Sequence, residues 1–209
     1  MKKKYFFCIQ SSKRDNHNQK IFSVEHSLIN YFSKNNIELY LSNPYLKYKN
    51  LKNFDGLIIT GGNDVFKNKK NFCPIRFNFE ENIIYKFLNS KKPIIAICYG
   101  FQRLNLYFGG RVTSCGKTSK FNHKYQHNIE IDFENIKLKT YTNHYHDDCI
   151  KVKNLSKKLK TIAIDPVSNT VEAAYSLKNK LYAIQWHPER KYSNKNLDKF
   201  LFKTFFSLI

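Results

Sequence analysis

Paired cysteines, acidic side chains and long apolar runs are all scarce in this chain of 209 residues. The five cysteines, at positions 8, 73, 98, 115 and 149, form no CxxC pair and no zinc-type spacing. We therefore expect reduced thiols, a cytoplasmic location and no metal site. The apolar run at 5–9 is too short for a signal peptide, and no segment is long enough to cross a membrane. The sequence thus predicts no membrane partner.

Charge of one sign dominates, because only 16 residues are acidic whereas 36 are Lys or Arg, a net charge of +20. A basic surface could attract nucleic acid, anionic lipid or an anionic small molecule. The other interpretation is a lysine- and asparagine-rich solvated surface, since the lysines are scattered and form no long run. The sequence contains no helix-turn-helix, zinc-finger or RNP-type pattern, so we expect no nucleic-acid partner. A basic nucleic-acid-binding protein remains the alternative from another functional class.

The length suits one α/β domain, which we expect to span residues 1–209. Short apolar runs predict strands at 5–10, 37–41, 56–59, 93–98, 129–133, 161–164, 171–175 and 181–186. Amphipathic stretches predict helices at 23–34, 79–88, 101–108 and 194–207, with Ser23 and Ser193 as caps. This alternation predicts a single-domain, doubly wound, mostly parallel sheet flanked by helices, with an antiparallel addition.

One of these predicted strands ends abruptly at Cys98, directly before a predicted helix. Ala96 and Gly100 on either side are small enough for a sharp strand-to-helix turn, which would lift the cysteine out of the sheet edge. A helix N-terminus favours a thiolate over a thiol, so Cys98 is a candidate nucleophile. The alternative is a buried, inert cysteine.

A candidate base follows the last predicted strand, in the sequence Gln185-Trp186-His187-Pro188-Glu189. Pro188 forces a turn that would bring Glu189 back beside the imidazole of His187. The carboxylate would then hold one ring nitrogen and aim the other at the cysteine. The alternative is a surface histidine before a proline turn.

Adjacent glycines follow another strand, in the sequence Gly61-Gly62-Asn63-Asp64. Glycines let backbone N–H groups approach a ligand closely, so Gly62 could form half of an oxyanion hole. The N–H of Tyr99, just after the nucleophile, would form the other half. The alternative is an ordinary Gly-Gly turn.

Taken together, these motifs resemble the class I glutamine amidotransferase family, and within it the free-standing γ-glutamyl hydrolases. The resemblance covers nearly the whole chain and implies the flavodoxin-like fold of that family, a Cys98–His187–Glu189 triad, and no metal or organic cofactor. It rests on five motifs in chain order: Gly61-Gly62-Asn63-Asp64, Ile97-Cys98-Tyr99-Gly100-Phe101-Gln102, Leu104-Asn105 with Gly109-Gly110, Asn143-His144-Tyr145-His146, and Gln185-Trp186-His187-Pro188-Glu189.

The sequence also departs from the family pattern. Ala96 stands where the turn usually opens with Gly, and Phe77 replaces Asp in what resembles the Arg-Asp-x-x-Glu element of the hydrolase branch, here with Arg76 and Glu80. Tyr99 stands where that branch commonly has Arg, and Asp147-Asp148 where the family often has His-Gln. We expect the changes at 99 and 147–148 to lie where the substrate binds.

By this resemblance the protein would cleave a γ-glutamyl amide of a small molecule and release glutamate through a γ-glutamyl thioester. The resemblance further implies that the substrate is held by Gly61, Asn63, Gln102, Tyr145, His146 and Asp147. Two alternatives stay open: a glutaminase subunit that delivers ammonia to a separate synthase partner, and a catalytically inactive scaffold.

The leaving group could be a polyamine-derived amine, a folate polyglutamate or a phosphoramidate. An anionic substrate would suit a basic mouth better than a cationic polyamine conjugate would. Four residues are close enough in sequence to the nucleophile and the following polar loop, 114–126, to line such a mouth: Arg103, Lys117, Lys120 and Lys124. The polarity of this loop also suggests a lid over the site.

Overall fold

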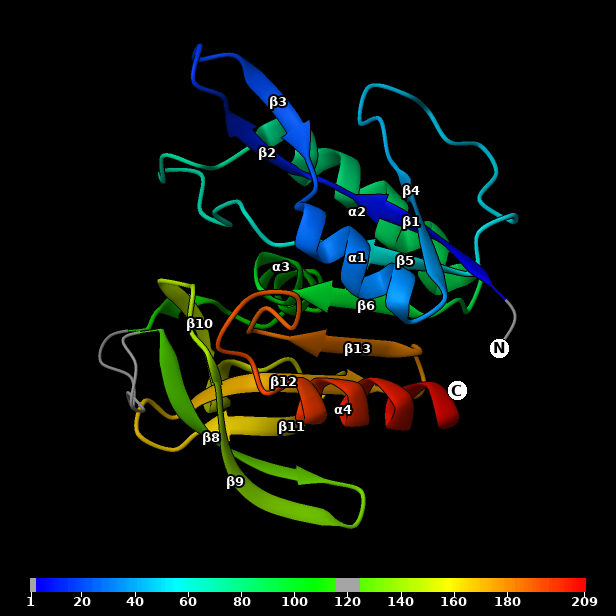
Figure 1. The fold of residues 1–209 in the computed structure, drawn as a ribbon. Helices are drawn as coiled ribbons and strands as arrows, with labels where there is room; N and C mark the ends of the chain where they lie inside the picture. Colours follow the sequence, from blue (N-terminus) through cyan, green and yellow to red (C-terminus); the bar gives the residue numbers. More distant parts are fainter. Residues whose placement is uncertain (1–2, 116–124) are drawn as a thin grey trace.

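The computed structural model of the protein describes residues 3–115 and 125–209. Within these residues an eleven-stranded mixed sheet has the order β4-β1-β5-β6-β13-β12-β11-β8-β9, with β10 beside β12 and β7 beside β10 (Figure 1). The sheet strands are β1 Lys4–Ile9, β4 Ile37–Leu41, β5 Gly56–Ile59, β6 Ile94–Ile97, β7 Thr113–Ser114, β8 Gln126–Phe133, β9 Ile136–Asn143, β10 Asp148–Lys151, β11 Lys160–Asp165, β12 Thr170–Ser176 and β13 Leu181–Ile184. A separate hairpin joins β2 Ser11–Arg14 to β3 Lys20–Ser23. The helices are α1 His26–Lys34, α2 Pro74–Asn89, α3 Tyr99–Tyr107, α4 Lys195–Ser207 and the 3-10 turn η1 Val152–Asn154.

Parallel strands form the half of the sheet that holds the predicted nucleophile. Strands β4, β1, β5, β6 and β13 run parallel, and β5, β6 and β13 are buried at every position. Continuous apolar runs are typical of parallel strands, because helices cover both of their faces. The predicted parallel sheet with an antiparallel addition is confirmed.

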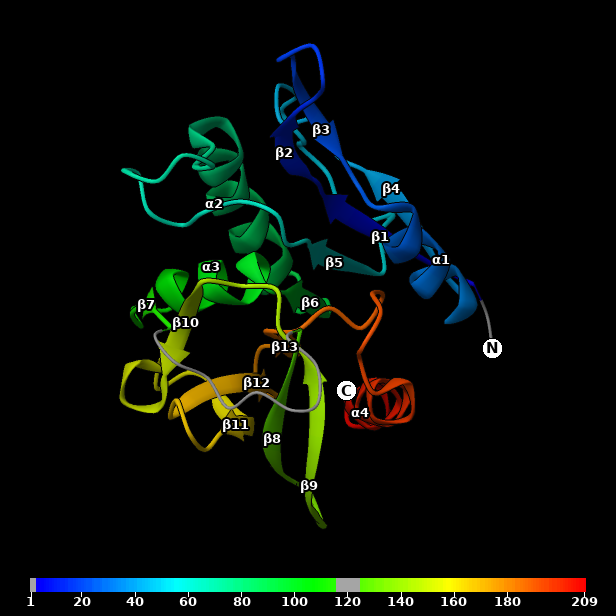
Figure 2. The ribbon, with the colours of Figure 1, turned by 60° about the vertical axis from the view of Figure 1, so that its left-hand side comes forward.

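Two hydrophobic cores lie on opposite faces of this sheet. Because side chains alternate along a strand, Ile95 of β6 packs with α1 and α4, whereas its neighbours Ile94 and Ala96 pack with α2 and α3. Figure 2 shows α2 and α3 on one side of the strands and α1 and α4 on the other. Strand β6, which leads to the predicted nucleophile Cys98, is therefore enclosed between two layers of helices.

Several predicted helix starts and caps differ from those in the structure. Helix α2 begins at Pro74 rather than at residue 79, since proline suits the first turn, where its missing N–H is not needed. The predicted Ser23 cap is wrong, because Ser23 ends β3 and α1 begins after Glu25. Helix α4 is capped by Asn194, whose side chain accepts from the N–H of Leu197, rather than by Ser193.

Several antiparallel elements were not predicted. The hairpin β2–β3 and strand β10 lie in polar or mixed sequence without a clear period of two, whereas β9 begins with the alternating sequence Ile-Lys-Leu-Lys, which is a strand signal. Strand β9 pairs with β8 along its whole length, from Gln126 opposite Asn143 to Phe133 opposite Ile136. This pairing carries the end of β9, and the motif that follows it, toward the predicted site.

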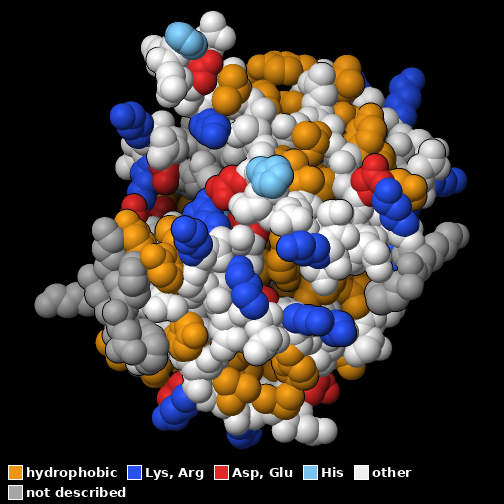
Figure 3. Space-filling model, viewed as in Figure 1, with side chains coloured by type: hydrophobic (Ala, Val, Ile, Leu, Met, Phe, Trp, Pro, Cys, Tyr) orange, Lys and Arg blue, Asp and Glu red, His pale blue; other side chains and the backbone are white. Residues whose placement is uncertain are grey.

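Basic side chains lie at many points of the surface. Figure 3 shows Lys and Arg side chains spread over one face, with acidic and apolar side chains between them. Among residues 3–115 and 125–209, none of the helices combines the length and the apolar character that a membrane span requires.

The core on the α2 side should depend on Phe87, which is fully buried. We expect Phe87→Ala to lower the free energy of unfolding by about 3–5 kcal/mol, because it removes packed apolar surface and leaves a cavity. Urea unfolding followed by circular dichroism measures this change. Tyr85→Ala on the exposed side of the same helix is the control, with an expected change within about 0.5 kcal/mol. Equal losses in both variants would contradict this assignment of the core.

Candidate active site

Cys98 lies at a strained turn between β6 and α3. Its backbone has φ +53° and ψ −109°, in the positive-φ region that residues with a side chain seldom adopt. Gly100 makes the turn possible, because a Cβ at this position would lie 2.3 Å from the carbonyl oxygen of Ile59 in β5. The first turn of α3 thus passes directly against the neighbouring strand, and Cys98 is presented at the carboxyl end of the sheet.

His187 and Glu189 adopt the arrangement predicted for a base and its partner. The carboxylate of Glu189 accepts a hydrogen bond from Nδ1 of His187 at 2.7 Å, and both side chains are almost fully buried. Strand β13 ends at Ile184, two residues earlier than predicted, so the motif lies on the turn after the strand. Nε2 is left to face the cysteine.

Cys98 and His187 meet beside Gly61. A Cβ built on Gly61 would lie 2.8 Å from Cε1 of His187 and 3.4 Å from Cβ of Cys98, so only glycine fits between them. Burial opposes ionisation of Cys98, but the positive charges of His187, His146 and Arg190 outweigh burial and lower the pKa of the thiol. Burial likewise opposes the charged form of His187, yet Cys98 and Glu189 raise the pKa of the imidazole to about 9. The two groups therefore favour a thiolate–imidazolium pair.

The Gly61-Gly62-Asn63 segment follows β5 and borders this pair. Gly62 has φ +97°, a conformation that glycine adopts without strain. A Cβ at Gly62 would lie 2.7 Å from Cβ of Ser11, so the β2–β3 hairpin packs closely against it. The side chain of Asn63 also bonds to Ser12, accepting from its N–H at 2.9 Å and donating to its carbonyl at 2.9 Å.

The other residues predicted to bind substrate occupy different environments. Tyr145 lies beside His187, with ring centroids 6.0 Å apart, and Asp147 is exposed. Gln102 is buried and its amide donates to the carbonyl of Asp148 at 2.8 Å. His146 is buried too, with Nδ1 3.0 Å from the same carbonyl. In this arrangement the amide N–H of Gln102 holds β10 in place.

Two expectations about substrate contacts are corrected. The side chain of Tyr99 does not line a substrate site: it is 2% exposed and its hydroxyl donates to Glu80 at 2.8 Å. Arg103 does not line a basic mouth either, because it is buried against Glu80 and Glu81. Of the other residues expected there, Lys117, Lys120 and Lys124 lie outside the described residues, as does most of the predicted lid at 114–126.

Sequence reasoning missed three polar residues around the pair. Asn143 holds the backbone of His187 through both amide atoms, accepting from its N–H at 2.9 Å and donating to its carbonyl at 2.7 Å. Gln185 donates to Sγ of Cys98 at 3.8 Å. Arg190 is paired with Glu25 and lies over the Tyr145 ring, 5.0 Å from its centroid. Asn143 and Gln185 belong to two of the motifs and Arg190 directly follows one, which is the signal that could have given them a role.

A buried cluster of histidines and carboxylates includes His146, whose charge acts on Cys98. His127 is 3.1 Å from Asp165 and 3.6 Å from Glu172, and His146 is 3.7 Å from the same Glu172 oxygen. Although burial raises the pKa of Glu172, the charges of the two histidines and the hydrogen bond from Thr170 outweigh it and lower this pKa. Apart from His146, which lies in a predicted motif, these residues are far apart in sequence and form no local pattern that would have predicted the cluster. Within residues 3–115 and 125–209 no set of three His, Cys, Asp or Glu side chains is arranged to hold a metal ion.

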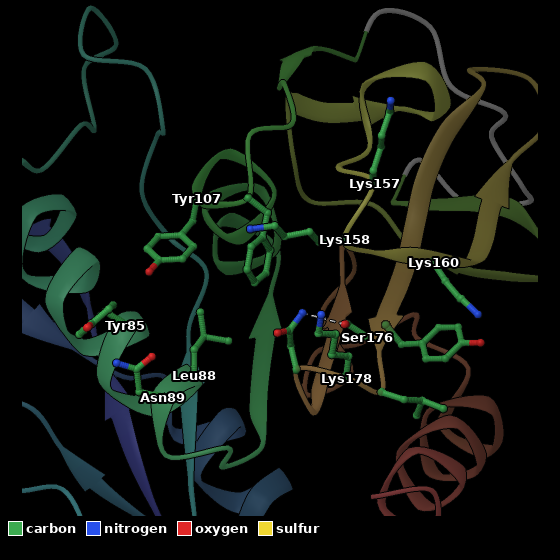
Figure 4. A pocket seen from close by; sticks show the side chains of 13 residues that line it. Tyr85, Leu88, Asn89, Tyr107, Lys157, Lys158, Lys160, Ser176 and Lys178 are labelled. Atoms are coloured by element: carbon green, nitrogen blue, oxygen red, sulfur yellow. Dashed lines mark hydrogen bonds between the residues drawn. The ribbon is translucent and has the colours of Figure 1, made fainter.

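A large pocket lies away from this site. It has a volume of about 610 Å³ and is lined by the C-terminal ends of α2 and α3 and by the turn before β13 (Figure 4). Tyr107, Lys158 and Lys178 are among its side chains, and none of the predicted site residues is. Because β13 and β6 run parallel, this pocket lies at the opposite edge of the sheet from Cys98.

Comparisons with known proteins identify the family of this chain. Residues 15–208 match the family Glutamine amidotransferase class-I. The glutamine amidotransferase-like protein YvdE of Lactococcus lactis is 31% identical over 189 residues, covering 78% of this chain and 79% of the relative. The γ-glutamyl-CDP-amidate hydrolase of Campylobacter jejuni is 28% identical over 163 residues, covering 78% and 74%.

Two further comparisons concern a synthase-type relative and the fold. One subunit of the glutamine-hydrolysing GMP synthase of Methanococcus vannielii is 30% identical over 159 residues, covering 74% of this chain and 70% of the relative. The crystal structure of Ta0944m from Thermoplasma acidophilum superposes with a TM-score of 0.73 at 16% identity, covering 100% of this chain and 94% of the other. The family match spans residues 15–208, and the chain belongs to the class I glutamine amidotransferase family.

Proposed function

We propose that this protein is a cysteine-dependent hydrolase that cleaves a γ-glutamyl amide bond and releases glutamate. The observation that carries the proposal is the meeting of Cys98 and His187 beside Gly61, with the imidazole held by Glu189 at 2.7 Å. A thiolate–imidazolium pair at a strand-to-helix turn supplies both a nucleophile and an acid. Membership of the family, and a relative named as a γ-glutamyl-CDP-amidate hydrolase, support this chemistry.

In the first half of the reaction the Cys98 thiolate attacks the γ-carbonyl carbon of the substrate. The N–H groups of Gly62 and Tyr99 would stabilise the negative charge that develops on the carbonyl oxygen. His187 donates its proton to the departing amine, the C–N bond breaks, and a γ-glutamyl thioester remains on Cys98. Glu189 stabilises the imidazolium before this proton is transferred.

In the second half a water molecule hydrolyses the thioester. Neutral His187 takes a proton from the water as its oxygen attacks the thioester carbon, and the same two N–H groups bind the oxyanion. The C–S bond breaks, glutamate leaves, and the thiolate–imidazolium pair is restored. The mechanism uses only protein groups and water.

For the substrate we propose a small anionic γ-glutamyl compound such as γ-glutamyl-CDP-amidate. The relative named for that compound and the net charge of +20 support an anionic substrate. The alternative is a glutaminase subunit that passes ammonia to a separate synthase, which the similarity to a GMP synthase subunit favours. Either way, the proposed chemistry at Cys98 is the same.

Side-by-side assays of glutamate release separate these possibilities. We expect the highest kcat/KM with γ-glutamyl-CDP-amidate, and lower values with γ-glutamyl-GABA and with glutamine. Preference for glutamine, or activity that rises when a synthase is added, would favour the role of an amidotransferase component. Failure to release glutamate from any of the three compounds would contradict the proposed function.

Replacement of the nucleophile should abolish turnover without unfolding the protein. We expect Cys98→Ala to reduce glutamate release to the background rate, because no other group can form the thioester. Its far-UV circular dichroism and urea midpoint should stay close to those of the wild type. Cys73→Ala, which changes a half-exposed cysteine before α2, is the matched control and should keep full activity. Turnover near the wild-type rate in Cys98→Ala would refute the assignment.

Replacement of Glu189 should narrow the pH range in which the ion pair exists. Glu189 raises the pKa of His187, and the charge on His187 lowers the pKa of Cys98. Glu189→Gln should therefore shift the alkaline limb of glutamate release to lower pH. The acidic limb of Cys98 alkylation should stay in place, because His187 is protonated there in both proteins. Loss of the charge-assisted hydrogen bond between Glu189 and His187 should move the alkaline limb by about one pH unit. An unchanged alkaline limb in Glu189→Gln would show that Glu189 does not raise the pKa of His187.

A further inference from the structure

A buried arginine lies beneath the glycine segment beside Cys98. Arg76 comes from the first turn of α2 and is 1% exposed. Its Nη1 donates to the carbonyl of Gly61 at 2.9 Å and to Oδ1 of Asn63 at 2.8 Å, and its Nη2 donates to the carbonyl of Thr60 at 2.5 Å. One rigid guanidinium thus fixes the residues on both sides of the Gly62 N–H.

The same arginine is paired with a carboxylate that reaches the other side of the turn. Glu80, one helical turn after Arg76, is fully buried and accepts from Nε of Arg76 at 2.7 Å. Its second oxygen accepts from the hydroxyl of Tyr99 at 2.8 Å and lies 3.3 Å from Nε of Arg103. Tyr99 and Arg103 are both in α3, and Tyr99 is the residue directly after Cys98.

The pair therefore joins the two segments that carry the proposed oxyanion donors. The guanidinium also lies 4.1 Å from the centroid of the Tyr99 ring, so Tyr99 is held by packing as well as by its hydroxyl. A buried ion pair is often no more stabilising than an apolar pair of the same size, because both charges lose their hydration. Its directional bonds, in contrast, fix the distance between the groups it contacts.

We propose that Arg76 and Glu80 are positioning residues that set the spacing of the Gly62 and Tyr99 N–H groups for the oxyanion. This inference rests on the proposed function, since it concerns the oxyanion of γ-glutamyl transfer. Oxyanion stabilisation depends on donors that are already in place before charge develops. Neither side chain touches the reacting atoms, so each acts through the backbone that it holds.

The proposal separates two reactions of the same cysteine. Attack on a γ-glutamyl amide places negative charge on an oxygen, whereas alkylation by iodoacetamide displaces iodide at a saturated carbon and builds no oxyanion. Loss of the positioning pair should therefore slow amide cleavage and leave alkylation unchanged. A merely structural role would slow both reactions together.

Two neighbouring glutamates on α2 give a matched pair of variants. We expect Glu80→Gln to lower kcat for glutamate release by about 100-fold or more, as for the loss of one oxyanion donor. The KM and the pH profile of Cys98 alkylation should stay as in the wild type. Glu81→Gln changes an exposed neighbour that contacts only Arg103 among these residues, and it should keep the wild-type kcat.

A milder variant guards against misfolding of Glu80→Gln. Tyr99→Phe removes only the hydroxyl that bonds to Glu80, keeps the ring in place, and should lower kcat by about tenfold, because one hydrogen bond to a charged group is lost. Glu80 accepts hydrogen bonds from both Tyr99 and Arg76, so these two side chains are coupled. The losses of kcat caused by Arg76→Lys and by Tyr99→Phe should therefore be less than additive in the double variant.

The outcomes distinguish this proposal from the proposed function. An active wild type with a folded Glu80→Gln or Tyr99→Phe variant that keeps the wild-type kcat would overturn the positioning role. Parallel losses of alkylation and glutamate release would overturn it as well, in favour of a structural role. A wild type that releases no glutamate from any of the three substrates would refute the proposed function and this inference with it.

Discussion

The close approach of α3 to β5 is the constraint on which the site depends. It requires a glycine at position 100 and holds Cys98 at a positive φ, a strained conformation that the surrounding sheet must maintain. The same approach brings the start of α3 beside the glycine segment after β5. The strand order places β13, and hence His187, on the other side of β6. The proposed nucleophile, the proposed base and the glycine segment meet because three adjacent parallel strands end at one edge of the sheet.

Buried polar networks surround this edge. Of the 16 acidic residues, Glu80, Asp148, Asp165, Glu172 and Asp198 are all buried, and Glu189 is nearly so. Each contacts a basic group or a hydrogen-bond donor of the protein, as buried charge requires. Among the described residues more acidic than basic side chains are buried, since only Arg76 and Arg103 of the Lys and Arg residues are, so the surface is more basic than the net charge alone suggests.

The ion pair between Arg76 and Glu80 links the glycine segment after β5 to the helix α3 that follows Cys98. The Tyr99 side chain shows how this changes the interpretation of the sequence. Its position next to the cysteine suggested a substrate contact, but the pleat and the helix turn direct the side chain inward to Glu80. The backbone N–H of a residue and its side chain can therefore serve different purposes on opposite sides of one turn.

The sequence by itself determined the strands β4 and β5 to the residue, the turn at Cys98, and the chain order of cysteine, histidine and glutamate. Local patterns sufficed there, because apolar runs, small residues and a proline act on their immediate neighbours. The contacts of Arg76 with Gly61, of Tyr99 with Glu80, and of Arg190 with Glu25 came only from the tertiary structure. They join residues 15, 19 and 165 positions apart, and the order of strands in the sheet, which no local pattern encodes, decides which of them meet.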